Sequence, residues 1–556
     1  SEWWALKELY AKGLLFKDFR ISPYCPRCGT TLSAHEVAQG YREIEDFSIY
    51  VKFKVEGKDE YFLVWTTTPW TLPANEYLAV NPDFNYILVN YKGEKLWIVE
   101  ERAKTVLKRY EVLDSRPGKS FVGTRYEQLV PFLKTRAGMY VVDGNFVTKE
   151  DGSGIVHIAP AFGSDDYSVM KKEKGELYVT VNESGKISLD SPWKGLDVQV
   201  ASDQIIEYLR KGGKLLKTEK ATHSYPFCWR CDTRLIYYPV ESWYIGVSKA
   251  KDQIVKYNQN VHWNPEYIRD GRFGNFLNEG KDWALSRNRF WGTPLPIWTC
   301  EDGHVFIPGS KKELTDRAFF IPENFELHRP MVDQIKVKCN ECGKEMKREP
   351  YPIDTWFDSG SAFFAQFHYP FENIELFSEN SPVDFISEAM DQTRGWFYSM
   401  HVISSLLFQR NAYDNVVVME FVMNSKGEKM SKSRGDTVDP LQLIEKIGTD
   451  SLRLFFFQGP PWKPKRFTEE GAVEFSRKLL GTIYNSYLLF STNARLDHWE
   501  PKEETIISNL DRWIYDRNNE CVSSVIKHMD EYNPHLALDD IRELVLDLSQ
   551  WYLRLS

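Results

Sequence analysis

A basic loop bracketed by glycines, residues 427–435, has the composition best suited to catalysis. It reads Gly-Glu-Lys-Met-Ser-Lys-Ser-Arg-Gly, so Lys429 and Lys432 supply mobile positive charges and the serines supply short donors. The glycines let the backbone bend sharply and approach a ligand closely. Such a loop suits closure over a polyphosphate, where it would stabilise the charge of a phosphoryl- or nucleotidyl-transfer transition state. A solvated basic turn is the alternative for a lysine-rich loop.

Six of the eight cysteines lie in three Cys-x-x-Cys pairs, which favours metal ligation in a reducing cytoplasm over disulfides. Two of these pairs stand about 200 residues apart and share the pattern aromatic-Cys-x-Arg-Cys-x-Thr-x-Leu. We expect them to supply the four corners of one tetrahedral zinc site, and two separate pairs of free cysteines are the alternative. A shared ion would make the intervening segment an inserted domain on a two-stranded stalk. The predicted ligands are Cys25, Cys28, Cys228 and Cys231.

A second zinc site is predicted in a small module at residues 300–350. Its ligands would be three thiolates and one imidazole, a known combination for structural zinc. The isolated Cys521 lies in a helical pattern and is expected in the core. The predicted ligands of the second site are Cys300, His304, Cys339 and Cys342.

Two polar stretches stand out between the first two cysteine pairs. Residues 65–75 read Trp-Thr-Thr-Thr-Pro-Trp-Thr-Leu-Pro-Ala-Asn, and a threonine run at a strand end presents several hydroxyls with stiff χ1 angles. Strand propensity alone is the simpler explanation of the threonines. In residues 152–167, His157 is followed by a glycine turn and an acidic pair. No serine or cysteine nucleophile with an orienting base is evident in either stretch.

A third polar stretch follows an apolar strand near residue 385 and opens a helix near Trp396. Ligands collect beyond the carboxyl ends of strands in α/β sheets, so this point is a candidate binding site. Arg287 and Arg289, further upstream, could hold either an anion or a helix end.

These stretches resemble segments of class I aminoacyl-tRNA synthetases, and the similarity covers nearly the whole chain. The Lys-Met-Ser-Lys-Ser loop resembles the signature loop of that family. Residues 65–75 and 152–167 resemble the editing domain of its isoleucyl, valyl and leucyl branches. The Thr-Thr-Thr-Pro form is similar to the isoleucyl branch, since relatives usually carry Thr-Thr-Arg-Pro. Residues 283–292 and 354–360 resemble two further blocks of the same subgroup.

The resemblance implies ATP-dependent activation of L-isoleucine, its transfer to tRNA(Ile) and hydrolytic editing of Val-tRNA(Ile). It implies a cytoplasmic monomer that uses ATP with Mg²⁺ as substrate and holds one or two structural Zn²⁺ ions. For catalysis, the resemblance implies that Lys429 and Lys432 bind the ATP phosphates and that Trp396 forms part of the amino-acid pocket. The residues implied to bind the adenylate are Glu388, Asp391, Gln392 and Lys432. In editing it assigns the tRNA 3′ end and the water to Thr66, Thr67, Thr68 and Asn75, the exclusion of isoleucine to His157, and the α-ammonium group to Asp166.

An editing site is needed because a single binding pocket discriminates only weakly between amino acids that differ by one methylene group. One methylene in a hydrophobic pocket is worth only about 1–3 kcal/mol, and the choice between isoleucine and valine is the standard illustration of this limit. A second pocket that admits only the smaller product supplies the remaining discrimination. Enlarging that pocket at His157 is therefore expected to expose correctly charged tRNA to hydrolysis.

The fold expected around these residues is α/β, with a Rossmann-type catalytic domain, an inserted β-rich barrel-like domain, small zinc modules and a C-terminal helical bundle. Alternating strands are expected at 47–55, 61–66, 87–89, 96–99 and 155–158, and amphipathic helices at 510–529 and 539–552. The expected domains are part of the catalytic domain at 1–45, the inserted editing domain at 46–220, the second catalytic half at 221–440, a stem-contact connection at 441–480 and the start of an anticodon-binding bundle at 481–556.

The chain of 556 residues carries a net charge of -9, so RNA contacts would need local basic patches, and no apolar run is long enough for a membrane span. None of the eleven histidines lies in the His-x-Gly-His motif of class I synthetases. We expect that motif to precede residue 1, in a longer protein, so that this chain alone would not form adenylate. The alternatives are a stand-alone editing hydrolase or tRNA-binding factor, a valyl or leucyl enzyme, and a structural zinc protein.

Overall fold

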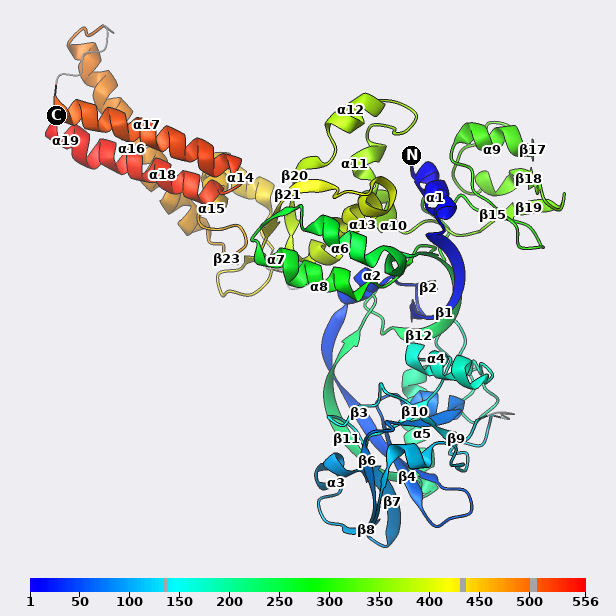
Figure 1. The fold of residues 1–556 in the computed structure, drawn as a ribbon. Helices are drawn as coiled ribbons and strands as arrows, with labels where there is room; N and C mark the ends of the chain where they lie inside the picture. Colours follow the sequence, from blue (N-terminus) through cyan, green and yellow to red (C-terminus); the bar gives the residue numbers. More distant parts are fainter. Residues whose placement is uncertain (134–137, 431–436, 501–507) are drawn as a thin grey trace. The chain divides into compact units, whose positions relative to one another are not determined.

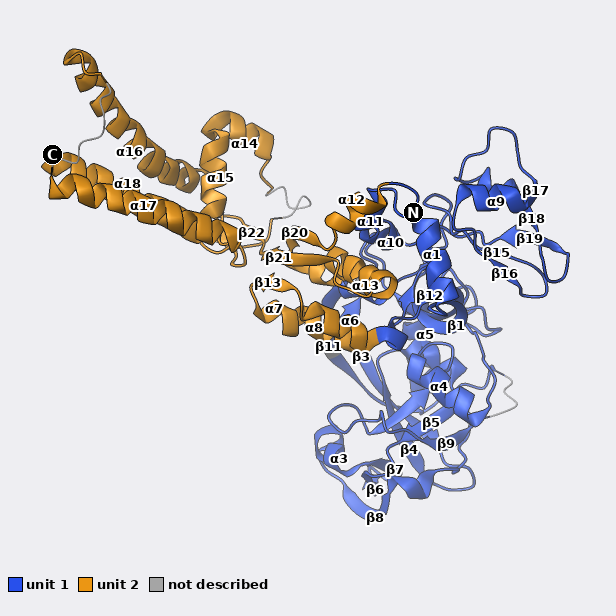
Figure 2. Cartoon of the chain, turned by 45° about the horizontal axis from the view of Figure 1, so that its top comes forward, with its two compact units in different colours: residues 1–250, 280–372 blue, residues 251–279, 373–556 orange. Residues whose placement is uncertain are grey.

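The computed structural model describes residues 1–133, 138–430, 437–500 and 508–556. These residues form two compact units, shown in different colours in Figure 2. Unit 1 consists of residues 1–250 and 280–372, and unit 2 consists of residues 251–279 and 373–556. The two units do not correspond one to one with the five predicted domains, because each unit is made of two separate segments of the chain. The limits of the five domains therefore remain predictions.

The first part of unit 1 is a small antiparallel sheet beside helix α1 (Glu2–Ala11). Strands β1 (Leu15–Cys25) and β12 (Ile236–Ile245) pair over most of their length, and the sheet order is β14-β12-β1-β2. Strand β2 is Thr30–Thr31, β14 is Trp283–Ala284, and helix α2 (Ala34–Ala38) follows β2. The first Cys-x-x-Cys pair starts at the last residue of β1 and the second lies shortly before β12, so this sheet brings the two pairs together.

A long antiparallel strand pair leads into the insert (Figure 1). Strand β3 (Tyr41–Lys54) pairs with β11 (Leu215–Pro226), and the register joins Tyr41 with Pro226 at one end. This pair has the form expected of a two-stranded stalk. The same strands continue into a six-stranded sheet of order β11-β3-β4-β7-β6-β8, so the stalk and the insert share a continuous sheet.

The insert contains two sheets around one large apolar core. The core holds strand residues such as Phe53 and Trp97 together with Ile205 of the helix α5. The remaining strands of the large sheet are β4 (Tyr61–Thr66), β6 (Asn85–Tyr91), β7 (Glu94–Val99) and β8 (Glu111–Pro117). The three-stranded sheet has the order β10-β5-β9, with β5 at Tyr77–Val80, β9 at Tyr140–Asp143 and β10 at Ile155–Ile158. The helical segments are η1 (Pro69–Ala74), α3 (Glu100–Leu107), η2 (Gly118–Phe121), α4 (Ser164–Glu173) and α5 (Val198–Lys211).

The last part of unit 1 is the predicted zinc module, a five-stranded sheet of order β16-β15-β19-β18-β17 with the helix α9 (Lys311–Arg317). Its own small core includes Trp298 and Val337. The strands are β15 (Trp298–Thr299), β16 (Val305–Phe306), β17 (Ala318–Phe320), β18 (Lys336–Lys338) and β19 (Glu345–Arg348), and the helices η4 (Val332–Gln334), α10 (Thr355–Gly360) and α11 (Ala362–Ala365) complete the part.

Unit 2 begins with a parallel sheet of order β13-β21-β20. Strand β20 (Val383–Ala389) is followed by η5 (Met390–Arg394), by the buried helix α13 (Trp396–Phe408) and by β21 (Tyr413–Met419), which forms a β-α-β unit. The short helix η3 (Val247–Ala250) ends the first segment of unit 1. The other elements of this part of unit 2 are α6 (Lys251–Asn258), β13 (His262–Asn264), α7 (Tyr267–Asp270), α8 (Arg272–Glu279) and α12 (Ile374–Glu379).

The rest of unit 2 is helical, apart from the short strands β22 (Val422–Met423) and β23 (Lys465–Arg466). The two predicted amphipathic helices are present as α17 (Asn509–Asp530) and as α18 (Pro534–Leu546), which continues through η7 (Asp547–Tyr552) into α19 (Leu553–Leu555). They follow α14 (Pro440–Ile447), α15 (Thr449–Phe457) and the long α16 (Glu469–Leu496). Within the described ranges, every helix is too short or too polar to cross a bilayer.

Candidate functional sites

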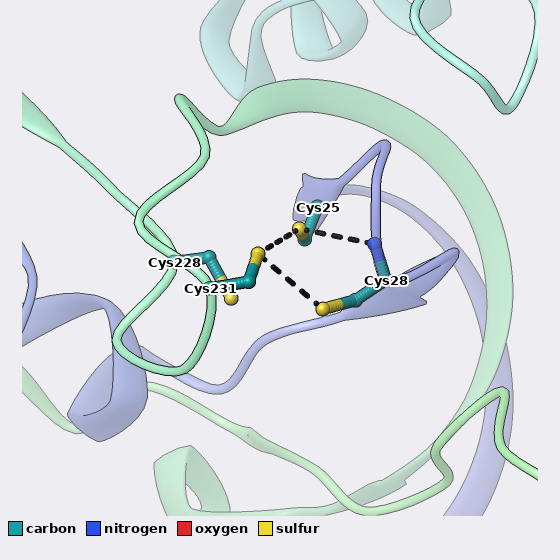
Figure 3. A group of neighbouring side chains, drawn as sticks. All are labelled: Cys25, Cys28, Cys228 and Cys231. Carbon is teal, nitrogen blue, oxygen red and sulfur yellow. Dashed lines mark hydrogen bonds between the residues drawn. The ribbon is translucent and has the colours of Figure 1, made fainter.

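The two distant Cys-x-x-Cys pairs form one cluster in unit 1 (Figure 3). The Sγ atoms of Cys25 and Cys28 each lie 3.5 Å from Sγ of Cys231, and the four ligand atoms lie within 4.8 Å of one another. Four sulfurs bound at about 2.3 Å to a zinc ion would lie about 3.8 Å apart, so the cluster has the size of a tetrahedral site. The Thr233 hydroxyl lies 3.3 Å from Sγ of Cys231.

Matching turns position these thiols. The backbone N–H of Gly29 donates to the carbonyl of Cys25 at 2.8 Å, and the N–H of Asp232 donates to the carbonyl of Cys228 at 2.9 Å. Each turn places the residue after the second cysteine in the left-handed region, with φ of +65° at Gly29 and +58° at Asp232. Two knuckles of the same geometry therefore face each other from β1 and from the segment before β12.

The second cluster joins Cys300, His304, Cys339 and Cys342, whose ligand atoms also lie within 4.8 Å of one another. The Nδ1 atom of His304 lies 3.4 Å from Sγ of Cys300 and 3.5 Å from Sγ of Cys339, so Nδ1 is the nitrogen turned to the thiols. Its Nε2 faces the Glu341 carboxylate at 3.2 Å. Three thiols and an imidazole at this spacing fit a structural zinc ion, as do the four thiols of the first cluster.

The threonine stretch and His157 form one hydrogen-bonded chain inside the insert. Thr66 ends β4, and its Oγ1 accepts the N–H of Thr68 at 3.1 Å and lies 3.3 Å from the Thr68 hydroxyl. The Thr68 hydroxyl lies 3.3 Å from that of Thr71, which in turn lies 2.8 Å from Nε2 of His157. On the other side of the imidazole, Nδ1 of His157 lies 3.4 Å from Nδ2 of Asn75. Four of the predicted editing residues thus belong to one network.

The network fixes the protonation of His157. The Thr71 hydroxyl donates its hydrogen to the carbonyl of Thr68 at 2.8 Å, so it accepts from Nε2–H of His157. The Nδ1 atom then has no proton and accepts from the Asn75 amide. Burial lowers the pKa of His157 to about 4, which agrees with a neutral ring. A neutral imidazole with both nitrogens occupied is suited to shaping a pocket rather than to acting as a base.

The other predicted editing residues lie beside this network. Asp166 stands in the first turn of α4, where its Oδ1 accepts the N–H of Ala159 at 2.7 Å. Burial raises its pKa to about 6, and the hydrogen bond from Ala159 opposes that rise. Thr67 takes no part in the threonine chain. It lines a cavity of about 420 Å³ together with Thr68 and the first turn of α5.

The predicted adenylate segment lies at the carboxyl end of the parallel strand β20, where such sheets bind ligands. Glu388 is exposed near the end of the strand, and Asp391 and Gln392 lie in η5. The side-chain oxygen of Gln392 accepts the N–H of Trp396 at 2.9 Å, which leaves its amide nitrogen 3.4 Å from Asp391. Gln392 therefore binds the first N–H of α13, whose N-cap is Gly395, and half-buried Trp396 begins that helix.

The lysine loop is described up to residue 430, and Lys432 lies outside the described residues. A tight turn precedes the loop, in which Asn424 Oδ1 accepts the N–H groups of Lys426 and Glu428 at 3.0 Å and 2.9 Å. Lys429 forms a bridge with Met423, and its Nζ lies 3.7 Å from the centre of the Phe421 ring. The first lysine of the loop thus follows a rigid turn.

Arg287 has a structural environment, which decides between the two possibilities that the sequence left open. Its guanidinium is buried in unit 1 and lies 2.6 Å from the carboxylates of both Glu36 and Asp354. It also donates to the carbonyl of Ala284 at 2.7 Å. Asp354 caps α10 by accepting the N–H of Trp356, so Arg287 ties a helix cap to the first knuckle segment.

Sequence reasoning missed three residues of these sites. Thr71 and Tyr126 belong to the His157 network, and Asp354 binds Arg287. Thr71 stands within the threonine stretch, four residues before Asn75, so that stretch contained a signal for it. Tyr126 had none, because it meets Asn75 only through the fold of the insert.

Comparison with known proteins places the chain in a family. The family model described as tRNA synthetases class I (I, L, M and V) matches residues 1–468. Isoleucine–tRNA ligase of Thermoplasma acidophilum is 49% identical over 560 residues, covering 100% of this chain and 54% of the relative. The corresponding ligase of Clostridium tetani is 47% identical over 562 residues, with coverages of 100% and 54%. The chain thus spans about half the length of the curated relatives it matches.

A solved LeuRS from Agrobacterium radiobacter K84, in a ternary complex with tRNA and LeuAMS, is 17% identical with a TM-score of 0.43, covering 99% of this chain and 72% of that chain. The family assignment rests on the sequence match, which extends over more than four-fifths of the chain and includes the lysine loop, the adenylate segment and the three cysteine pairs. The chain belongs to the class I tRNA synthetases (I, L, M and V).

Proposed function

We propose that the protein is an isoleucine–tRNA ligase, which activates L-isoleucine with ATP, transfers it to tRNA(Ile) and hydrolyses mischarged Val-tRNA(Ile). The observation that carries this proposal is the buried hydrogen-bonded chain in which Thr66 and Thr68 lead through Thr71 to the neutral His157. The identity of nearly one half to isoleucine–tRNA ligases along the whole chain supports the same choice of amino acid.

In the activation reaction, Glu388, Asp391 and Gln392 would bind the adenylate at the carboxyl end of β20. Trp396, at the start of α13, would form a wall of the amino-acid pocket. Lys429 and Lys432 would stabilise the negative charge that develops on the phosphates as pyrophosphate leaves, with Mg²⁺ bound to ATP. The turn at 424–428 supports this role, because it holds the first lysine on a defined backbone.

In editing, Asp166 would bind the α-ammonium group of the misattached valine. Its Oδ1 is held by the Ala159 N–H, which leaves Oδ2 to receive the ammonium. The threonine hydroxyls and Asn75 would hold the tRNA 3′ end and a water molecule. The water attacks the ester carbonyl, and the ribose hydroxyl of the tRNA leaves with a proton. We propose that a substrate hydroxyl relays this proton, because both nitrogens of His157 are already engaged.

The two cysteine clusters would each hold a structural Zn²⁺ ion. Zinc bound by four protein ligands has no open position, so it contributes stability to the fold and takes no part in the reaction. Cys25, Cys28, Cys228 and Cys231 would hold one ion at the root of the stalk, and Cys300, His304, Cys339 and Cys342 would hold the other.

The deciding experiment is hydrolysis of Val-tRNA(Ile) and Ile-tRNA(Ile) by this chain. We expect selective loss of valine, abolished by Asp166→Ala and retained by the matched control Asp165→Ala, whose side chain is exposed one position earlier. Asp166→Ala removes the partner of the ammonium group. His157→Ala should extend hydrolysis to Ile-tRNA(Ile), because it enlarges the pocket. Equal hydrolysis of both substrates by the unmodified chain would contradict the isoleucyl assignment.

A stand-alone editing hydrolase is the second candidate, favoured by the hydrogen-bonded chain from Thr66 to His157, which lies wholly within the insert. ATP–pyrophosphate exchange distinguishes the two. The 556 residues alone should show no isoleucine-dependent exchange, since half of the phosphate clamp of class I enzymes is absent from them. Exchange restored in a longer chain that carries an upstream His-x-Gly-His segment supports the ligase, and its continued absence supports the hydrolase.

A further inference from the structure

Tyr126 is buried in the insert, outside the named strands, and the sequence gives no reason to connect it with editing. Its side chain is 2% exposed, and its ring packs edge-on against Phe53 of β3, with 5.4 Å between the ring centres. Its backbone N–H donates to Met139 at 3.1 Å, and it forms a bridge with Val55. The backbone of Tyr126 and its ring are therefore both held, which positions the hydroxyl at the end of the ring.

The Tyr126 hydroxyl meets Asn75, and the directions of the hydrogen bonds around that amide are determined. Asn75 Nδ2 lies 2.9 Å from the carbonyl of Tyr77, and a carbonyl only accepts, so the nitrogen must face it. The oxygen Oδ1 therefore faces Tyr126, at 2.9 Å, and the phenol donates. The second hydrogen of Nδ2 is left for Nδ1 of His157, at 3.4 Å.

The hydrogen bond from Tyr126 to Asn75 determines the orientation of the Asn75 amide, and that orientation determines the hydrogen bond from Asn75 to His157. In the described part of the chain, Oδ1 of Asn75 accepts its hydrogen bond from Tyr126. Asn75 is 3% exposed, so water does not readily replace a lost donor. Without the phenol, Oδ1 would be a buried acceptor without a partner, and the amide would gain by turning out of its present plane. That rotation would withdraw the donor from Nδ1 of His157.

We propose that Tyr126 is a positioning residue of the editing site: its hydroxyl fixes the Asn75 amide, and Asn75 together with Thr71 holds His157 as the Nε2–H tautomer. In the described residues, the hydrogen bond of the Tyr126 hydroxyl goes to Asn75, so Tyr126 acts on His157 through Asn75. The part of this inference that concerns isoleucine exclusion rests on the proposed editing function, whereas the part that concerns the tautomer does not.

The test compares Tyr126→Phe with Tyr86→Phe in the whole chain. Tyr86 is an equally buried tyrosine of the same core, whose hydroxyl donates to the carbonyl of Gly154 at 2.7 Å and accepts the N–H of Asn81 at 3.0 Å. Tyr126→Phe loses one buried phenol hydrogen bond and Tyr86→Phe loses two, so the control should lose at least as much stability. The Tyr86 hydroxyl is not linked to Asn75 or His157, so Tyr86→Phe reports destabilisation without a change at the pocket.

The first measurement is the nitrogen NMR spectrum of chain labelled with ¹⁵N-histidine, with the His157 signals identified by their loss in His157→Ala. The unmodified chain and Tyr86→Phe should show a single Nε2–H tautomer for His157, and Tyr126→Phe should show averaging between two tautomers. The second measurement is the ratio of Val-tRNA(Ile) to Ile-tRNA(Ile) hydrolysis, which should fall roughly tenfold in Tyr126→Phe alone, the equivalent of one buried hydrogen bond.

The outcomes separate the two proposals. An unchanged His157 spectrum in Tyr126→Phe overturns the role of Tyr126. A changed spectrum in a chain that does not hydrolyse Val-tRNA(Ile) supports the positioning role and overturns the editing function. If Tyr126→Phe does not fold, Asn75→Ala removes the same link at its centre and must give the same change in the spectrum, and a single remaining tautomer there overturns the inference.

Discussion

Asp166 carries a charge that depends on pH close to neutrality. Its pKa is raised to about 6 by burial, against the hydrogen bond from Ala159. A raised pKa means that the carboxyl group is mostly protonated below pH 6 and ionised above it. Only the ionised form attracts an ammonium group strongly, so the proposed binding of an aminoacyl end to Asp166 should weaken in acid. The acidic side of the pH profile therefore reports on this side chain.

We predict that kcat/KM for Val-tRNA(Ile) hydrolysis falls about tenfold for each pH unit below about 6, as expected when one essential group is protonated. The measurement is the deacylation rate between pH 4.5 and 8. Asp166→Asn should be slow at every pH and lack this acidic limb, whereas Asp165→Asn should keep it. A limb that persists in Asp166→Asn would assign it to another group.

Glu341 is predicted to support the second metal cluster through His304. Its carboxylate lies 3.2 Å from Nε2, while Nδ1 faces the thiols, which is the arrangement that orients a metal-bound imidazole. Glu341→Gln should weaken zinc binding by about tenfold, at the low end for such partners because this carboxylate is exposed. Competition with a chelator measures the affinity. Glu345→Gln, in the same module and paired with Lys336, should leave it unchanged.

Site residues that lie close together in the sequence could be predicted from it, whereas site residues that only the fold brings together could not. Spacing and matched flanks indicated the metal ligands, because both knuckles are local turns that carry their own pattern. Tyr126 binds Asn75, which is 51 positions away in the sequence, and Asp354 binds Arg287, which is 67 positions away (354 − 287). Such pairs depend on how distant segments pack, and a single sequence contains no spacing that records them.

At the scale of elements, the stalk shows why strand limits were harder to predict than strand existence. The expected strand began at residue 47, whereas β3 begins at Tyr41, and β11 was not among the expected strands. The first residues of β3 are mostly exposed on both faces, so they lack the alternation that marks a half-buried strand. Backbone pairing with β11 determines their conformation instead.

Gly40, at the root of the stalk, is predicted to be intolerant of a side chain. A Cβ atom there would lie 1.9 Å from the carbonyl oxygen of Phe227, whose own N–H donates to Gly40 at 2.9 Å. Gly40→Ala must push β3 away from the residue that precedes Cys228. We expect a loss of about 1–3 kcal/mol in the free energy of unfolding, the usual cost of overpacking, together with weaker zinc binding.

Chemical denaturation and zinc release measure both effects. Gly212→Ala is the matched control, because it lies just before β11 and its Cβ would have no neighbour closer than 3.4 Å. Equal stability of the two variants would mean that the root of the stalk adapts to the methyl group. Loss of stability without zinc release would mean that the β3–β11 strand pair affects the stability of the fold independently of the zinc knuckles.

At the scale of the whole molecule, the first zinc ion is predicted to secure the root of the stalk rather than the insert. The core around the knuckles is small and includes Leu32, Val37 and Leu235 beside the cysteines, whereas the core of the insert is large and lies mostly within residues 41–226. Removal of zinc should therefore expose residues 26–40 and 227–235 to proteolysis and leave residues 41–226 resistant. Limited proteolysis with and without a chelator, read by mass spectrometry, provides the measurement.

The variant Cys28→Ser with Cys231→Ser should reproduce the cleavage pattern without chelator. Replacement of Cys300 and Cys339 by serine should instead direct cleavage to residues 300–350, which supplies the control for the second cluster. Uniform digestion of the insert after zinc removal would contradict an independent core. Resistance at both root segments would mean that the strand pairs β1–β12 and β3–β11 hold the root without metal.

The cysteine cluster at the root also sets an order of events during synthesis. Cys25 and Cys28 leave the ribosome about 200 residues before Cys228 and Cys231, a delay of roughly 10–40 s at about 5–20 residues per second. For that time the first knuckle has only half of a coordination shell, and β3 has no β11 to pair with. Most strands of the insert emerge in between, and its sheet is completed only when β11 emerges just before Cys228. Metal capture is thus the closing step of this part of the molecule, and a nascent chain with a misfolded insert would be left with four reactive thiols.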